Sequence, residues 1–203
     1  MLLPFVILIL VSIPERMRRA RAWDCEESLS RGRQIWLALE EFKKTYGRYP
    51  DASTAAMVKA RADSAWELKT DTSNDVFRQL IAAGLIDSEW IFQAEGKGMS
   101  KPDGNMSTEA EALKRGECGF AYVDGASFDG NEKRPLAVAP LIPGTHRFDP
   151  TVWDGKAVVV RADGSVVLYR LGADGGCIAP GGRDLFDPIF WGGVAPRVYW
   201  QDK

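Results

Sequence analysis

The sequence predicts an α+β protein in which one long amino-terminal helix packs on a mostly antiparallel β-sheet, with short helices inserted between them. Apolar side chains recur at three- and four-residue steps over residues 25–46, which is typical of a helix. After Gly119 the apolar periodicity changes to two, which is typical of strands. The pair Asp163-Gly164 separates two apolar runs and indicates a β-hairpin. The chain is 45% hydrophobic and 27% charged, a composition typical of a globular protein and not of a disordered or multi-span membrane protein.

The chain begins with an apolar run over residues 2–13 (LLPFVILILVSI). As a helix this run would reach roughly 18 Å, short of the ~30 Å hydrocarbon core of a bilayer. It lacks the charged front of a signal peptide, and no good cleavage site follows it. We expect residues 1–13 to be a truncated membrane-anchoring helix, the end of a longer apolar segment. The alternative is a buried first helix or strand of a soluble domain.

Residues 14–47 are predicted to form a basic stalk that continues as an amphipathic helix and ends at Gly47. Its first part could contact anionic lipid headgroups through Arg16, Arg18, Arg19 and Arg21. By the positive-inside rule, the part of the chain that follows the apolar run and carries these arginines would lie in the cytoplasm. Its second part carries an apolar stripe that we expect to pack on the sheet. The residues expected at this contact are Leu29, Trp36, Leu39 and Phe42.

Residues 48–203 are predicted to form the globular head. A second helix is expected from residue 53 or 54 to 68, and a third from Ser73 as its N-cap to Gly84. Residues 88–92 are interpreted as a short strand. The capping-box pattern Thr108-x-x-Glu111 predicts a short helix that ends at Gly116.

The strands of the sheet are predicted over residues 120–123, 136–142, 156–162 and 165–171. The segment after Gly175 is rich in glycine and proline but also carries aromatic residues. We expect this segment to wrap the sheet as irregular chain and to end in a last short strand.

An oxygen-rich loop (VDGASFDGNE) follows the first predicted strand. Asp124, Asp129, Asn131 and Glu132 could supply several of the six to eight oxygen ligands that calcium takes. The spacing does not match an EF-hand, and a solvent-exposed turn is the alternative. The sequence predicts no other cofactor.

The sequence contains a single histidine, His146, so a histidine-rich metal site is excluded. A Ser-His-Asp catalytic triad could use only this residue. It lies in a loop between two prolines, and the residues near it in the sequence do not form a pattern that is specific to hydrolases. The net charge of −2 and the pI near 5.6 argue against nucleic acid as a partner.

The three cysteines match no zinc pattern. Outside the cytoplasm, Cys118 and Cys177 could form a disulfide and leave Cys25 as a buried thiol. Three free thiols are the alternative.

The segment CEESLSRGRQIWLALEEFKKTYGRYPD resembles the region after the membrane helix in type II secretion pseudopilin-like and type IV pilin-like proteins of verrucomicrobial and planctomycetal bacteria. The segments SNDVFRQLIAAGLIDSEWIF, LKRGECGFAYVDG and WDGKAVVVRADGSVVLYRL are similar to head regions of the same family, so the resemblance covers about residues 14–171. The prepilin signature of the family, a cleavage glycine followed by Phe-Thr-Leu-Ile-Glu, does not occur here, and no counterpart of its glutamate precedes Glu15. We expect either that the true start codon lies upstream or that this member no longer assembles as a filament subunit.

The resemblance implies a pilin-like fold and a non-enzymatic, membrane-anchored structural component of a type II secretion or type IV pilus-type system. Its partners would be membrane lipid and other pilin-like subunits or secretion-system components. It implies anchoring in the inner membrane with the head in the periplasm or outside the cell, the reverse of the orientation given by the arginines. Some family members bind calcium in a loop of the head. The alternative function is an anchored binding module for an extracellular glycan or polymer, using aromatic residues such as Trp153, Trp191 and Trp200.

Overall fold

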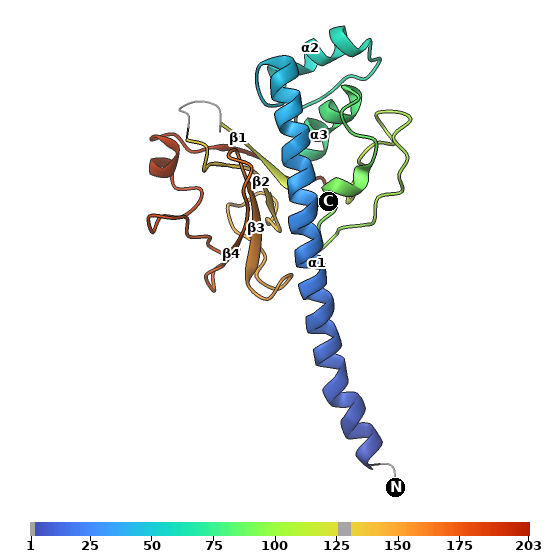
Figure 1. Ribbon diagram of the computed structural model, residues 1–203, viewed down its shortest axis with the longest axis vertical. Coiled ribbons are helices and arrows are strands. Elements are labelled where there is room, and N and C mark those ends of the chain that lie inside the picture. Colours follow the sequence, from blue (N-terminus) through green and yellow to red (C-terminus); the bar gives the residue numbers. More distant parts are fainter. Residues whose placement is uncertain (1–2, 126–130) are drawn as a thin grey trace.

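The computed structural model describes residues 3–125 and 131–203, with side chains from residue 15 onward except that of residue 17. The molecule is an α+β protein with a long amino-terminal helix and a five-stranded antiparallel sheet, as the sequence predicted (Figure 1). The helices are α1 (Leu3–Tyr46), α2 (Ala52–Ala62), α3 (Ser73–Ala82) and the short 3₁₀ helices η1 (Glu89–Phe92) and η2 (Pro188–Trp191). The strands are β1 (Ala121–Asp124), β2 (Pro135–Ala139), β3 (Lys156–Arg161), β4 (Val166–Arg170) and β5 (Arg197–Tyr199).

Helix α1 joins the predicted apolar, basic and amphipathic segments into a single helix of 44 residues. Its carboxyl-terminal half lies between the sheet and the α3–η1 side of the head, while its amino-terminal half projects away from the head (Figure 1). The helix ends where predicted, because Gly47 takes a left-handed φ of +81° and its N–H donates to the carbonyl of Lys43 at 2.8 Å.

Helices α2 and α3 begin with capping boxes. Asp51 caps α2, which begins close to the predicted residue but ends at Ala62, since Asp63 adopts a left-handed conformation (φ +49°). The predicted extension to residue 68 is therefore wrong. Helix α3 is capped by Thr72 and not by Ser73, whose backbone N–H donates to the carbonyl of Trp200.

Two predicted elements differ in the structure. Residues 88–92 form the 3₁₀ helix η1 and not a strand, because a period of three buries Glu89 and Phe92 on one side while Trp90 faces outward. The helix predicted from Thr108 to residue 116 is a series of turns. A regular helix does not form through this segment because Leu113 adopts a left-handed φ of +47° and donates its backbone N–H to the carboxylate of Glu89.

The sheet has the strand order β4-β3-β2-β1-β5, and every neighbouring pair is antiparallel. All four predicted strands are present with slightly different ends. The predicted hairpin joins β3 to β4, with Val160 opposite Val166 and Gly164 in the turn at φ +83°. The expected last strand is β5, which pairs with β1.

Side chains from the two faces of the sheet enter separate cores. One face packs under α1, α3 and η1 through residues such as Tyr122, Val158 and Val160. The other face carries Val138 and Val159, and is covered by the irregular segment before β5, which contributes Leu185, Phe186 and Trp191. The predicted wrapping of the sheet by this segment is confirmed.

Candidate functional site

The contact between α1 and the sheet uses the residues predicted for it. Leu39 and Phe42 are fully buried, and Leu29 and Trp36 are half-buried against the same core. The indole Nε1 of Trp36 donates to the carbonyl oxygen of Ala162 at 3.3 Å, at the tip of the β3–β4 hairpin. The second half of α1 is therefore part of the head.

The closest approach of α1 to the sheet is at Gly32. A Cβ placed on Gly32 would lie 2.9 Å from Cγ2 of Val160 and 3.0 Å from Cγ1 of Val166. These distances are shorter than ordinary van der Waals contact, so a glycine is needed for the backbone of the helix to reach the strands.

The basic segment of α1 leaves the head near Arg21, whose guanidinium lies 3.0 Å from the carboxylate of Asp154 on the turn before β3. Arg19 pairs with Glu15 one turn away on the same helix, and Arg16 and Arg18 are exposed. Contact of these arginines with lipid stays a prediction. Within the described residues, none of the helices combines the length and the apolar character needed to cross a membrane.

The predicted calcium loop is described only in part, and Asp129 lies outside the described residues. Asp124 ends β1, and burial raises the pKa of its carboxyl above the usual range. It lines a mainly apolar cavity of about 500 Å³ together with Arg134 and Trp191. Asn131 accepts from the N–H of Lys133 in a turn, and Glu132 is exposed. Calcium binding by these residues stays a prediction.

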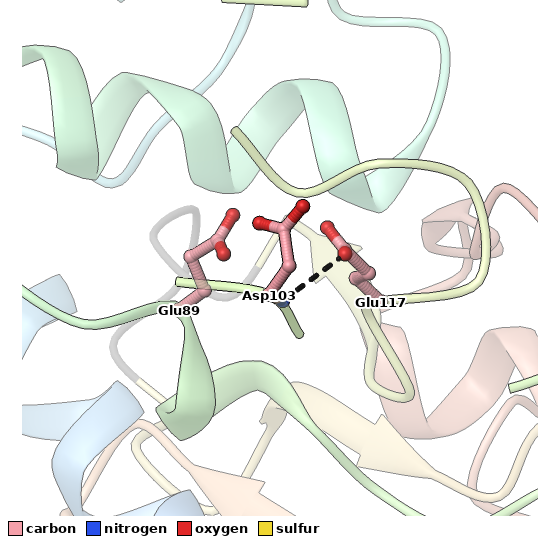
Figure 2. Close-up of side chains that lie close together, drawn as sticks. All are labelled: Glu89, Asp103 and Glu117. Atoms are coloured by element: carbon pink, nitrogen blue, oxygen red, sulfur yellow. Dashed lines mark hydrogen bonds between the residues drawn. The ribbon is translucent and has the colours of Figure 1, made fainter. Parts of the chain in front are cut away.

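A second group of carboxylates, not expected from the sequence, gathers beside η1. Figure 2 shows the side chains of Glu89, Asp103 and Glu117 next to one another, with carboxylate oxygens that all lie within 4.8 Å. Glu89 and Glu117 are buried, and Asp103 is exposed. Carboxylate oxygens are the ligands that hard cations such as Ca²⁺ take, so these three residues have the chemistry to hold one.

Each buried carboxylate of this acidic cluster also accepts hydrogen bonds from backbone N–H groups of the loop over residues 95–118. Glu89 accepts from the backbone N–H of Leu113 at 2.6 Å and from that of Gly104 at 3.0 Å. Glu117 accepts from the backbone N–H of Lys114 at 2.7 Å and, more weakly, from that of Asp103 at 3.3 Å (Figure 2). These two carboxylates therefore supply acceptors for backbone N–H groups of an irregular loop.

Two carboxyls of the acidic cluster have pKa values that are shifted in opposite directions. Burial, with the neighbouring carboxylates of Glu117 and Asp103, raises the pKa of Glu89, although its two backbone donors oppose the shift. The ammonium of Lys114 lies 2.6 Å from Asp103 and lowers the pKa of that carboxyl. The sequence offered no signal for this group, because its members are up to 28 positions apart and only the folded loop brings them together.

The predicted disulfide between Cys118 and Cys177 is not formed. All three cysteines are free and buried. Cys118 lies in the core beneath α1 and Cys177 in the core on the opposite face, so the sheet separates the two thiols. Burial raises the pKa of each of these two thiols to about 12.

The tryptophans suggested for glycan binding do not form an exposed surface. Trp153 and Trp191 are buried, and Trp200 is half-buried with its indole N–H donating to the carbonyl of Thr145. His146 is exposed and stacks on Phe186, with ring centres 4.9 Å apart. In the described part of the chain, no hydrogen bond orients its imidazole as a catalytic base requires.

Comparison of the chain with protein-family models, with curated proteins and with solved structures finds no match.

Proposed function

We propose that this protein is a non-enzymatic, membrane-anchored, pilin-like structural component of a type II secretion or type IV pilus-type system. Its apolar amino-terminal segment attaches it to the inner membrane, and its head lies in the periplasm or outside the cell. It acts through packing of its helix and head against other pilin-like subunits or secretion-system components.

The observation that carries this proposal is the division of α1 into two parts with different surroundings. From Arg21 onward the helix is held by the head, through the ion pair to Asp154, the close approach at Gly32 and the burial of Leu39 and Phe42. Before Arg21 the same helix continues for five turns without the head beside it (Figure 1). A rigid helix that carries an apolar end away from a folded head suits attachment at a membrane.

The chemistry of the remaining groups is consistent with a structural role. The buried carboxylates of Glu89 and Glu117 hold a loop, and the buried thiols of Cys118 and Cys177 have raised pKa values. A reactive thiol requires the opposite shift.

Deleting residues 2–13 tests the anchor. We expect the full chain to sediment with bacterial membranes, and the deletion variant to be recovered in the soluble fraction as a monomer. Replacing Arg16 and Arg18 by glutamine provides a control, since it changes the basic segment and keeps the apolar one. If the deletion variant still fractionates with membranes, or if the full chain is recovered in the soluble fraction, the proposal is wrong. Protection of the three cysteines from a thiol reagent verifies that each variant is folded.

A further inference from the structure

A groove on the head lies between the outer side of α1 and the 3₁₀ helix η1. Its central residue is Trp90 of η1, whose side chain is 41% exposed although its neighbours Glu89 and Phe92 are fully buried. Two adjoining hollows of about 320 Å³ and about 190 Å³ are both lined by Trp90, Glu27 and Arg31. Trp90 therefore lines both hollows, together with two residues of α1.

The walls of this Trp90 groove carry hydrogen-bonding groups that are available to a ligand. In the part of the chain that the structure describes, no hydrogen bond or ion pair uses the indole N–H of Trp90, the amide of Gln34 or the carboxylate of Asp87. Arg31 is held in place by the carbonyl of Gln93 at 3.2 Å and by Glu27 at 2.5 Å, which leaves other guanidinium N–H groups to donate.

The groove is built on packed elements, so its shape is fixed before a ligand arrives. Phe92, two residues from Trp90, is fully buried and stacks on Phe77 of α3, with ring centres 4.6 Å apart. The α1 wall is held by its contact with the sheet at Gly32. A preformed site loses less conformational entropy on binding than a flexible one.

We propose that the Trp90 groove binds the pyranose rings of an oligosaccharide that carries no negative charge. The apolar C–H face of a pyranose packs on the face of an indole, whose quadrupole attracts the positive edges of C–H groups. The ring hydroxyls both donate and accept, which suits a wall that mixes amide, carboxylate and guanidinium groups.

The charges of the groove exclude acidic ligands. Its two hollows are lined by four carboxylates and two cations, which gives a negative local field. The carboxylates are those of Asp24, Glu27, Asp87 and Glu95, and the cations are Arg31 and Lys101. Phosphate, nucleic acid and uronic-acid polymers would meet repulsion there, whereas neutral or amino-bearing sugars would not.

The site extends along α1 toward Trp23, whose side chain is 69% exposed. Trp23, Glu27, Ser30 and Gln34 are spaced by four, three and four residues, so they share one face of the helix. Trp23 thus offers a second stacking surface one helical turn before Glu27, and a chain of several sugar units fits this arrangement better than a monosaccharide. The groove belongs to the head, so its function is independent of the anchor proposed above.

Titration of the full chain with soluble cello-, malto- and chito-oligosaccharides tests the proposal, in a detergent without a sugar headgroup. We expect at least one series to change the tryptophan fluorescence and to bind more tightly as the oligosaccharide lengthens, and oligogalacturonate not to bind. Trp90→Ala should weaken binding by about tenfold or more, Trp90→Phe should retain part of it, and Trp23→Ala should weaken long oligosaccharides more than short ones.

Leu37→Ala is the matched control, because Leu37 is an exposed apolar residue of the same helix that does not line the groove. This variant should bind as the wild type does. The proposal is overturned if none of the neutral or amino-bearing oligosaccharides binds, if the oligogalacturonate binds as well as they do, or if Trp90→Ala binds normally. Binding of a polyamine with no binding of sugars would assign the groove to cations instead. Protection of the three buried cysteines from a thiol reagent shows whether Trp90→Ala is folded, and so separates loss of the site from loss of the fold.

Discussion

Gly32 of α1 lies directly against Val160 of β3, with room for a hydrogen atom and not for a methyl group. A Cβ on Gly32 would come within 2.9 Å of Cγ2 of Val160. We expect Gly32→Ala to lower the free energy of unfolding by about 1–2 kcal/mol, since overpacking costs ~1–3 kcal/mol and the higher helix propensity of alanine returns up to ~1 kcal/mol. Urea denaturation measures the change.

The matched control for Gly32→Ala is Ser30→Ala on the exposed side of the same helix, which should change stability by less than ~0.5 kcal/mol. Val166→Ala should cost less in the Gly32→Ala background than in the wild type, because it removes the other methyl groups that the new Cβ meets. Purely additive effects of the two substitutions would contradict a close contact at this position.

Gly164 in the β3–β4 turn should tolerate substitution by alanine even less well than Gly32. It adopts a φ of +83°, and a Cβ there would lie 2.8 Å from Cζ2 of Trp36. Gly164→Ala is expected to cost about 2–4 kcal/mol, about 1–2 kcal/mol from the left-handed backbone and the rest from the clash with the indole. Gly144→Ala separates the two contributions, since Gly144 has a φ of +76° but no atom within 4 Å of its Cβ position. Equal losses in the two variants would show that Trp36 is not the obstacle.

Removing the buried carboxylate of Glu89 should loosen the loop over residues 95–118. Glu89→Ala leaves the backbone N–H groups of Leu113 and Gly104 without acceptors, at about 1–3 kcal/mol for each group that stays buried. Glu89→Gln keeps one acceptor oxygen and should cost about half as much. Hydrogen exchange at the two amides measures the effect, with Glu41→Gln, an exposed change in α1, as a control. Unchanged protection of both amides in Glu89→Ala would contradict this role.

The raised pKa of Glu89 gives stability an unusual pH dependence. Between its ordinary value of 4.5 and its raised folded-state value, the folded protein retains a proton that the unfolded chain has released. The contribution of this carboxyl to stability is therefore fully present below pH 4.5 and falls as the pH rises through that window. The advantage of the wild type over Glu89→Gln should thus be larger at about pH 4 than at about pH 7 in denaturation experiments. An advantage that grows with pH would indicate a lowered pKa.

The three buried thiols should be unreactive in the native protein. Burial raises the pKa of Cys118 and Cys177 to about 12, and that of Cys25 is also raised. With a colourless disulfide reagent at about pH 8, we expect no rapid reaction in the folded state and three thiols in denaturant, because only the exposed thiolate attacks. Fewer than three thiols in denaturant, restored by a reductant, would indicate a disulfide after all.

The acidic cluster and the glycan prediction show where sequence reasoning stops. Residues 88–92 are predicted as a strand because the three apolar residues after Glu89 form too short a run to show a distinguishing period, and the carboxylate of Glu89 cannot be placed beside Asp103 and Glu117 without the fold of the loop. Sequence reasoning offers Trp153 and Trp191 as glycan-binding residues because an aromatic residue in a turn or in an irregular glycine-rich segment gives no signal of burial. Trp153 is buried in the core beneath α1, and Trp191 is buried where the glycine-rich segment packs on the second face of the sheet.

The sequence alone determined the long helix, its apolar stripe from Leu29 to Phe42, its end at Gly47 and the hairpin at Asp163-Gly164. These features depend on periodicity and backbone preferences within a few neighbouring residues, which the order of amino acids records directly. Only the tertiary structure decided that the sheet separates Cys118 from Cys177, that Glu89 meets Glu117, and that Trp90, not Trp153, faces solvent. Those outcomes depend on which distant segments cover one another, and long-range packing leaves no local pattern in the chain.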